Sequence, residues 1–155
     1  LQLDPGINDK MTKQFFHPYP RVAEGQLLVE QGVKTAIDVS DGLIQDLSHI
    51  CKASRAGARI EIDRVPIPPT VKANFGEKSR ELALSGGEDY ELLFTASAEV
   101  VDKVKTDASC PITVIGEILA DKLGEIILVD SQGKPFKLDK AGWEHFTSDE
   151  TKFTK

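Results

Sequence analysis

The sequence has few cysteines, no long apolar run and no excess of positive charge, and each absence argues against a class of protein. Its two cysteines, Cys51 and Cys110, make neither a disulfide framework nor a zinc-binding pattern. No run approaches the roughly 18 apolar residues of a membrane-spanning helix, and no cationic and apolar leader opens the chain. The formal net charge of −6, from 19 basic and 25 acidic residues, argues against binding to nucleic acid or to an anionic membrane. We therefore expect a cytoplasmic protein that binds neither.

The composition that remains is typical of one globular domain. Hydrophobic residues make up 40% and charged residues 28% of the 155 positions, which is ordinary for a folded protein and argues against wholesale disorder. A chain of this length can bury a core without disulfides. Because the first residue is Leu1 rather than Met, we expect the chain to be a piece of a longer protein.

Apolar periodicity predicts a short strand over 35–39 that is followed by a helix over 42–56. Serine and aspartate are favoured helix caps, so we expect Ser40 or Asp41 to cap this helix. One face of the helix should be buried, and it consists of Leu43, Leu47, Ile50, Cys51 and Ser54.

The rest of the chain alternates between helical and extended patterns without a strict strand–helix–strand rhythm. We expect further helices over 21–30, 70–74, 79–84 and 98–107, and further strands over 59–63, 90–95, 111–119 and 125–129. A polar turn that contains Gly124 should join the last two strands as a hairpin. This order predicts an α+β fold, with a mixed sheet flanked by helices.

The first candidate site is the segment 38–43, where the strand ends and the helix begins. Asp38, Ser40 and Asp41 lie there together. Ligands bind at strand ends, and the free N–H groups of a helix start attract phosphate. The two carboxylates would repel a phosphate unless a cation lay between them, and Mg²⁺ takes carboxylate and phosphate oxygens together. The alternative is that Ser40 or Asp41 only caps the helix while Asp38 faces solvent.

Two further segments could carry chemistry. In 85–92 a double glycine precedes three acidic residues, which would let the backbone approach a ligand but could equally form a plain turn. Trp143 could stack on a flat ring or simply pack in the core. The three histidines, His17, His49 and His145, form no metal-binding spacing, and the residues indicate no catalytic acid, base or nucleophile.

Taken together and in order, several blocks resemble the thiamine-monophosphate kinases. The strongest are AIDVSDGL at 36–43 and ALSGGEDYEL at 83–92, and the others are HPYPRV at 17–22, GARI at 57–60, IGE at 115–117 and GWEHF at 142–146. The first strong block alone is shared with the wider group of aminoimidazole-ribonucleotide synthetase-like enzymes. The two strong blocks together are specific to the kinases, and the resemblance runs over 17–146.

The resemblance implies an ATP- and Mg²⁺-dependent kinase that converts thiamine monophosphate to thiamine diphosphate. It also implies the C-terminal-domain fold of aminoimidazole-ribonucleotide synthetase. No catalytic residue is implied, because the accepting phosphate oxygen is already ionised. Position by position, the implied roles are Mg²⁺ ligation by Asp38 and Asp41, ATP contact by Ser40, substrate contact by Glu88 and Trp143, and loop support by Gly42, Gly86 and Gly87.

The same resemblance implies that an N-terminal domain is missing from this chain. We expect 1–16 to be a lead-in, 17–146 to be the C-terminal domain and 147–155 to be a polar tail. Since the active site should lie between the two domains, we expect this chain alone to be an inactive monomer and the full-length protein to be a homodimer. The rival readings are a sister enzyme (selenophosphate synthetase, the hydrogenase-maturation dehydratase or the purine-pathway synthetase) and a non-catalytic binding module.

Overall fold

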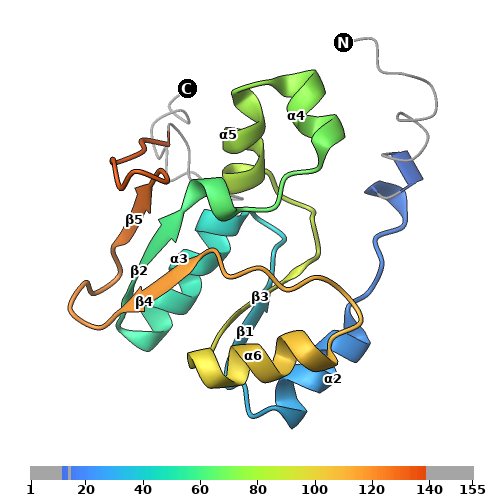
Figure 1. The fold of residues 1–155 in the computed structure, drawn as a ribbon, viewed down its shortest axis with the longest axis vertical. Helices are drawn as coiled ribbons and strands as arrows, with labels where there is room; N and C mark the ends of the chain where they lie inside the picture. The colour runs from blue at the N-terminus through green and yellow to red at the C-terminus, as the bar shows by residue number, and fades with distance from the viewer. Residues whose placement is uncertain (1–11, 14, 139–155) are drawn as a thin grey trace, which may run out of the picture.

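Two small β-sheets organise the part of the chain that the structure, a computed structural model, describes: residues 12–13 and 15–138 (Figure 1). Strand β1 (Thr35–Asp38) pairs with β3 (Leu92–Thr95) in an antiparallel two-stranded sheet. In the three-stranded sheet, β2 (Gly57–Glu61) lies between β4 (Gly116–Leu119), which is antiparallel to it, and β5 (Ile126–Val129), which is parallel. The second sheet is therefore mixed, and the predicted α+β class is confirmed.

Helices cover these sheets and correspond to the five expected helical segments. They are α2 (Val22–Glu30), α3 (Leu43–Ser54), α4 (Pro69–Phe75), α5 (Lys78–Ser85) and α6 (Ala98–Asp107), with a 3₁₀ turn, η1, at Ile62–Arg64. Helix α3 contacts both β1 and β2, so it joins the two sheets, whereas α2 packs against α6. Among the described residues, no helix has both the length and the apolar character needed to cross a bilayer.

The predicted hairpin is wrong, because the strands β4 and β5 do not pair with each other. Both pair with β2, which lies between them. The connection between β4 and β5 instead crosses the start of β2, where the Gly124 N–H donates to the Ala56 carbonyl oxygen at 2.8 Å. A side chain at Gly57 would collide with the Lys122 carbonyl oxygen. Because Gly57 has no side chain, the connection can pass close to the backbone of β2 at this position.

The core forms around one face of helix α3. Leu43, Leu47, Ile50 and Cys51 are buried there as predicted, whereas Ser54 at the end of the helix is exposed. Leu43, Leu47 and Cys51 belong to a cluster that extends to both sheets and α5. Its other members include Val39, Ala58, Ile60, Ile62, Leu84 and Leu128, and Leu93 of β3 packs against it. Helix α3 is thus the element on which the packing of the described part converges.

The start of helix α3 is held by a buried carboxylate that the sequence analysis did not single out. Gly42 is the N-cap, with a φ of 123° and no side-chain cap, so the expected cap by Ser40 or Asp41 is wrong. Instead, Asp46 Oδ2 accepts the backbone N–H groups of Ser40, Asp41 and Gly42 at 3.0, 3.1 and 3.2 Å. The left-handed φ at Gly42 lets the loop fold back over the first helical turn. A negative charge is favourable at that end of a helix.

Replacing Leu47 should test whether the face of α3 is the core. Leu47 is 2% exposed, so Leu47→Ala should lower the free energy of unfolding by about 2–5 kcal/mol through lost burial and a residual cavity. Leu123→Ala makes the same chemical change at a side chain that is 72% exposed, and should leave the free energy within about 0.5 kcal/mol. Urea denaturation measures both, and equal effects would contradict this placement of the core.

Asp46→Asn should test whether the carboxylate holds the loop. The neutral amide is a weaker acceptor for three N–H donors, and we expect a loss of about 1–3 kcal/mol in the free energy of unfolding. Asp121→Asn, on an exposed turn, is the matched control and should change little. Denaturation at neutral pH compares the two variants. If Asp46→Asn were as stable as the control, the loop would not depend on that charge.

Candidate functional site

The segments 38–43 and 85–92, which are far apart in the sequence, lie against each other in the structure. The backbone pairing of β1 with β3 continues beyond the strands, since the Val39 N–H donates to the Glu91 carbonyl oxygen at 2.9 Å. The Tyr90 N–H donates to the Val39 carbonyl oxygen, and the Glu88 N–H to the Ser40 carbonyl oxygen, both at 2.8 Å. The loops 38–42 and 85–91 therefore form one hydrogen-bonded unit, which we call the paired loops.

Glycine makes this close approach possible. A Cβ at Gly42 would lie 2.9 Å from the Ser85 carbonyl oxygen, and one at Gly87 would collide with the Ser40 carbonyl oxygen. A Cβ at Gly86 would likewise collide with the Leu82 carbonyl oxygen. The three glycines expected to support the loops thus occupy positions where any side chain would force backbone apart. The sequence signal was the double glycine beside the acidic run.

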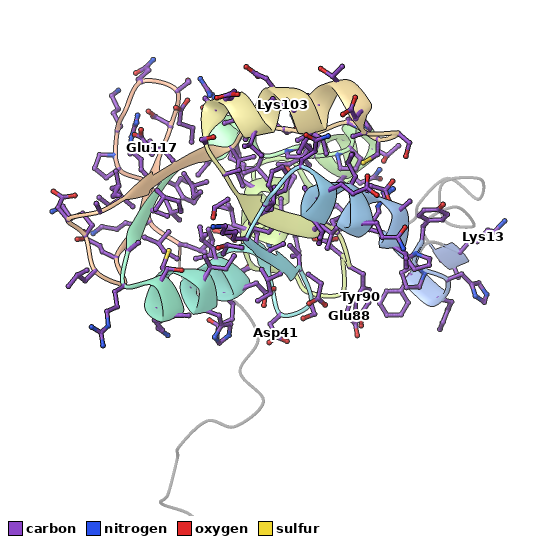
Figure 2. All side chains as sticks on the ribbon, turned by 90° about the horizontal axis from the view of Figure 1, so that it is seen from below. Lys13, Asp41, Glu88, Tyr90, Lys103 and Glu117 are labelled. Atoms are coloured by element: carbon purple, nitrogen blue, oxygen red, sulfur yellow. The ribbon has the colours of Figure 1, made fainter. Side chains whose placement is uncertain are left out.

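The predicted polar residues reach the surface at the paired loops. Asp38 and Glu88 are exposed, and Ser40 and Asp41 are half-buried. Figure 2 shows Asp41, Glu88 and Tyr90 along one edge of the molecule. Trp143, the other residue expected to contact substrate, lies outside the described residues. The described part of the expected site is therefore an open, acidic edge.

The backbone of the second loop adopts an unusual conformation. Glu88 and Tyr90 have φ angles of 67° and 52°, in the left-handed region that residues other than glycine rarely adopt. Such residues persist where the surrounding structure dictates their conformation, and they cluster at functional sites. No sequence pattern indicated this, because neither residue type favours a positive φ.

The acidic run has one strong cationic partner. Arg21 donates from Nε and Nη2 to the two carboxylate oxygens of Glu91 at 2.8 and 2.7 Å. Asp89 forms no ion pair with any residue that the structure describes. Its desolvation, with a smaller contribution from the negative charge of Glu91, raises the pKa of its carboxyl group. The sequence left open whether His17 and Arg21 contact a ligand. In the structure the Arg21 guanidinium is engaged with Glu91, and His17 is exposed.

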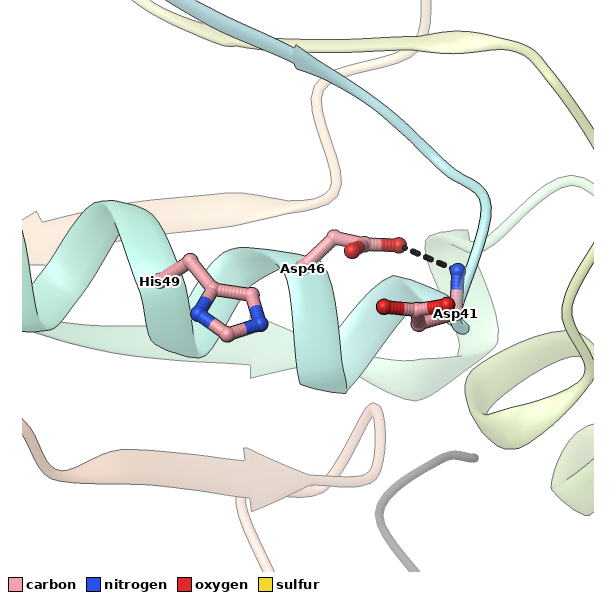
Figure 3. Close-up of side chains that lie close together, drawn as sticks. All are labelled: Asp41, Asp46 and His49. Carbon is pink, nitrogen blue, oxygen red and sulfur yellow. Dashed lines mark hydrogen bonds between the residues drawn. The ribbon is translucent and has the colours of Figure 1, made fainter. Parts of the chain in front are cut away.

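Among the described residues, one group of three side chains has a metal-binding arrangement: Asp41, Asp46 and His49 (Figure 3). Their ligand atoms lie within 4.8 Å of one another. Asp38, the other expected metal ligand, is not in this group. Sequence reasoning missed Asp46 and His49, although their spacing of three on a helix places them on the same face. The apolar periodicity of that helix indicated only a buried face.

The chemistry of the donors distinguishes two kinds of cation. Carboxylate oxygens such as those of Asp38 and Asp41 suit Mg²⁺, whereas an imidazole such as that of His49 suits transition metals. One oxygen of Asp46 already accepts three backbone N–H groups, so this carboxylate holds the loop before helix α3. The oxygens at the loop edge fit Mg²⁺ better than the mixed group of three does.

The structure also contains a hollow away from the paired loops. A hollow of about 250 Å³ lies between η1, α4 and α5, and among its lining residues are Asp63, Lys72 and Arg80. None of its lining residues belongs to the paired loops.

The chain is similar to known proteins over most of its length. A model of the family described as "AIR synthase related protein, C-terminal domain" matches residues 10–129. Thiamine-monophosphate kinase of Escherichia coli K12 is 40% identical over 144 residues, which is 90% of this chain and 43% of that protein. The chain thus spans less than half the length of this relative.

Solved structures agree with the sequence matches. The thiamine-monophosphate kinase of Stenotrophomonas maltophilia K279a has a TM-score of 0.73 and 33% identity, and covers 88% of this chain and 42% of its own. The structure of AaThiL complexed with AMPPCP and TMP has a TM-score of 0.74 and 25% identity, over 94% of this chain and 43% of its own. These matches confirm the resemblance and the fold expected from the sequence blocks. The chain belongs to the family of AIR synthase related proteins and corresponds to their C-terminal domain.

Proposed function

We propose that the chain is the C-terminal half of an ATP- and Mg²⁺-dependent phosphotransferase that converts thiamine monophosphate to thiamine diphosphate in thiamine biosynthesis. The observation that carries the proposal is the pairing of the loops 38–42 and 85–91, which joins the two most specific sequence blocks into one acidic edge. Relatives named as thiamine-monophosphate kinases support it, as does the related structure complexed with AMPPCP and TMP. The cytoplasmic setting stays a prediction.

Each residue of the edge has a role that suits its chemistry. Asp38 and Asp41 would hold Mg²⁺, which when bound neutralises negative charge on the phosphate groups. The Ser40 hydroxyl can donate a hydrogen bond to a nucleotide phosphate. Glu88 presents a carboxylate, which attracts the positively charged thiazolium ring of thiamine, and Trp143 would stack on a substrate ring.

The reaction places few demands on acid–base chemistry. The accepting oxygen of thiamine monophosphate is already ionised, so no residue of the chain has to remove a proton. What the chain must do is bind both substrates and hold the reacting groups in line. Hydrogen-bonded loops that glycines bring into close contact are suited to that positioning role.

The exposed edge supports a site that is completed by another domain. The chain spans 43% of the Escherichia coli kinase, and we infer that an N-terminal domain supplies the rest of the nucleotide site and the dimer contact. This chain by itself should then be a monomer that does not turn over ATP. Thiamine diphosphate formation by the chain alone, or a tight dimer in sedimentation, would contradict this part of the proposal.

A sister activity is the main alternative, since the matching family is described as AIR synthase related. The block at 83–92 and the kinase relatives favour thiamine monophosphate as acceptor. An acceptor screen on the two-domain protein separates the readings. ATP consumption driven by a purine-pathway amidine, with none for thiamine monophosphate, would favour the synthetase.

Titration of the chain with thiamine monophosphate tests the substrate directly. Trp143 is the only tryptophan in the chain, so its fluorescence reports on ring contact at that residue. We expect saturable quenching that is stronger with Mg²⁺ and absent with inorganic phosphate. A flat response in this chain and also in the two-domain protein would contradict the role of Trp143.

Asp38→Asn tests the metal role without disturbing the core. Asp38 is exposed at the end of β1, so the variant should keep its melting temperature while the Mg²⁺-dependent gain in thiamine monophosphate affinity falls at least about tenfold. Calorimetric titration with and without Mg²⁺ measures this, with Asp121→Asn as control. An unchanged Mg²⁺ effect would favour the non-catalytic module.

A further inference from the structure

We propose that Arg21 is a positioning residue that acts through Glu91 to hold the loop carrying Glu88 in its binding conformation. Arg21 does this by an ion pair that links helix α2 to the start of β3, across 70 positions of sequence. The part of the inference that concerns substrate rests on the proposed function. The conformational part stands on contacts within the chain.

The loop needs an external restraint. Glu88 and Tyr90 both have left-handed backbone angles, and residues other than glycine keep this strained conformation only where the surrounding structure holds them in it. The N–H groups of both residues donate to the neighbouring loop, at Ser40 and Val39. These bonds fix one side of the loop, and Glu91 is where the loop enters the sheet.

The ion pair is placed at this entry point. Glu91 accepts the Val39 N–H through its backbone oxygen at 2.9 Å, and both of its carboxylate oxygens accept the Arg21 guanidinium. A two-pronged pair fixes direction as well as distance. The conformation of residue 91 is therefore restrained from two sides, one residue after the strained Tyr90.

Arg21 is itself restrained. Its guanidinium lies 5.4 Å from the centre of the Tyr19 ring, and Nη1 is 3.8 Å from Glu24 Oε1. Glu24 is buried and accepts the Ser109 hydroxyl at 3.0 Å. The hydrogen bond from its own backbone N–H, with that from Ser109, holds the pKa of Glu24 below its usual value. Exposed ion pairs contribute little when both side chains are free, but Arg21 is held in place before it meets Glu91.

The test combines hydrogen exchange with substrate binding in the 155-residue chain. Arg21→Ala should speed exchange of the Glu88 and Tyr90 amides about tenfold, while the amide of Ile60 in the core sheet keeps its rate. Arg21→Lys retains the positive charge but loses the two parallel hydrogen bonds to Glu91, so its exchange rates should lie between those of the unsubstituted chain and Arg21→Ala. If Arg21→Ala does not fold, Arg21→Lys takes its place in the test. Arg59→Ala removes another exposed arginine–glutamate pair, with a 2.7 Å contact to Glu117, and should leave the loop unchanged.

A double-mutant cycle tests whether Arg21 acts through Glu91. Arg21→Ala and Glu91→Ala should each weaken thiamine monophosphate binding about tenfold, and the double variant should be no weaker than either. Unchanged exchange at Glu88 and Tyr90, faster exchange with unchanged affinity, or additive losses would each overturn the inference. If thiamine monophosphate binds neither the unsubstituted chain nor the two-domain protein, the proposed function and the substrate part fail together. The exchange rates then decide the conformational part alone.

Discussion

The candidate site depends on the backbone hydrogen bonds between the loops that follow β1 and precede β3. Those bonds bring residues about 50 positions apart into contact and set which side chains share an edge. The Ser85 carbonyl oxygen lies where a side chain at position 42 would be, and the Ser40 carbonyl oxygen lies where one at position 87 would be. Glycine at both positions removes these collisions. A substitution at either glycine would act on the site by separating the loops, without removing any group that contacts a ligand.

Charge is the second constraint on this edge. Asp38, Asp41, Glu88, Asp89 and Glu91 lie on the paired loops, and like charges so close together repel one another. The structure compensates part of this charge itself, through Arg21 at Glu91. Just behind the edge, the buried Asp46 directs its charge at three backbone N–H groups. The carboxylates left at the surface form a field that favours cations, which suits both Mg²⁺ and the thiazolium ring of the proposed substrate.

Local patterns in the sequence predicted the helices and most strands, because apolar spacing reflects burial of one face. They failed where structure depends on distant partners. The expected hairpin of β4 and β5 is wrong because β2, more than 50 residues earlier, lies between them. The role of Asp46 could not be predicted, because its hydrogen-bond partners are backbone N–H groups, which every residue type except proline has. The blocks at 36–43 and 83–92 were found, but their contact arises from strand pairing that no local pattern encodes. The roles of their side chains stay predictions.

The core and the site occupy separate parts of the described structure. Core packing converges on helix α3, and the loop edge lies at the N-terminal end of that helix, where Asp46 connects the two. Asp38 and Glu88 are exposed on the paired loops, so the loops can be shaped by this domain while their outer side faces solvent. An enclosed site for phosphoryl transfer must exclude water as well as bind. That requirement is the physical reason to expect that a second domain covers the edge. The shape of the loops themselves is set within this chain, in part by the ion pair between Arg21 and Glu91.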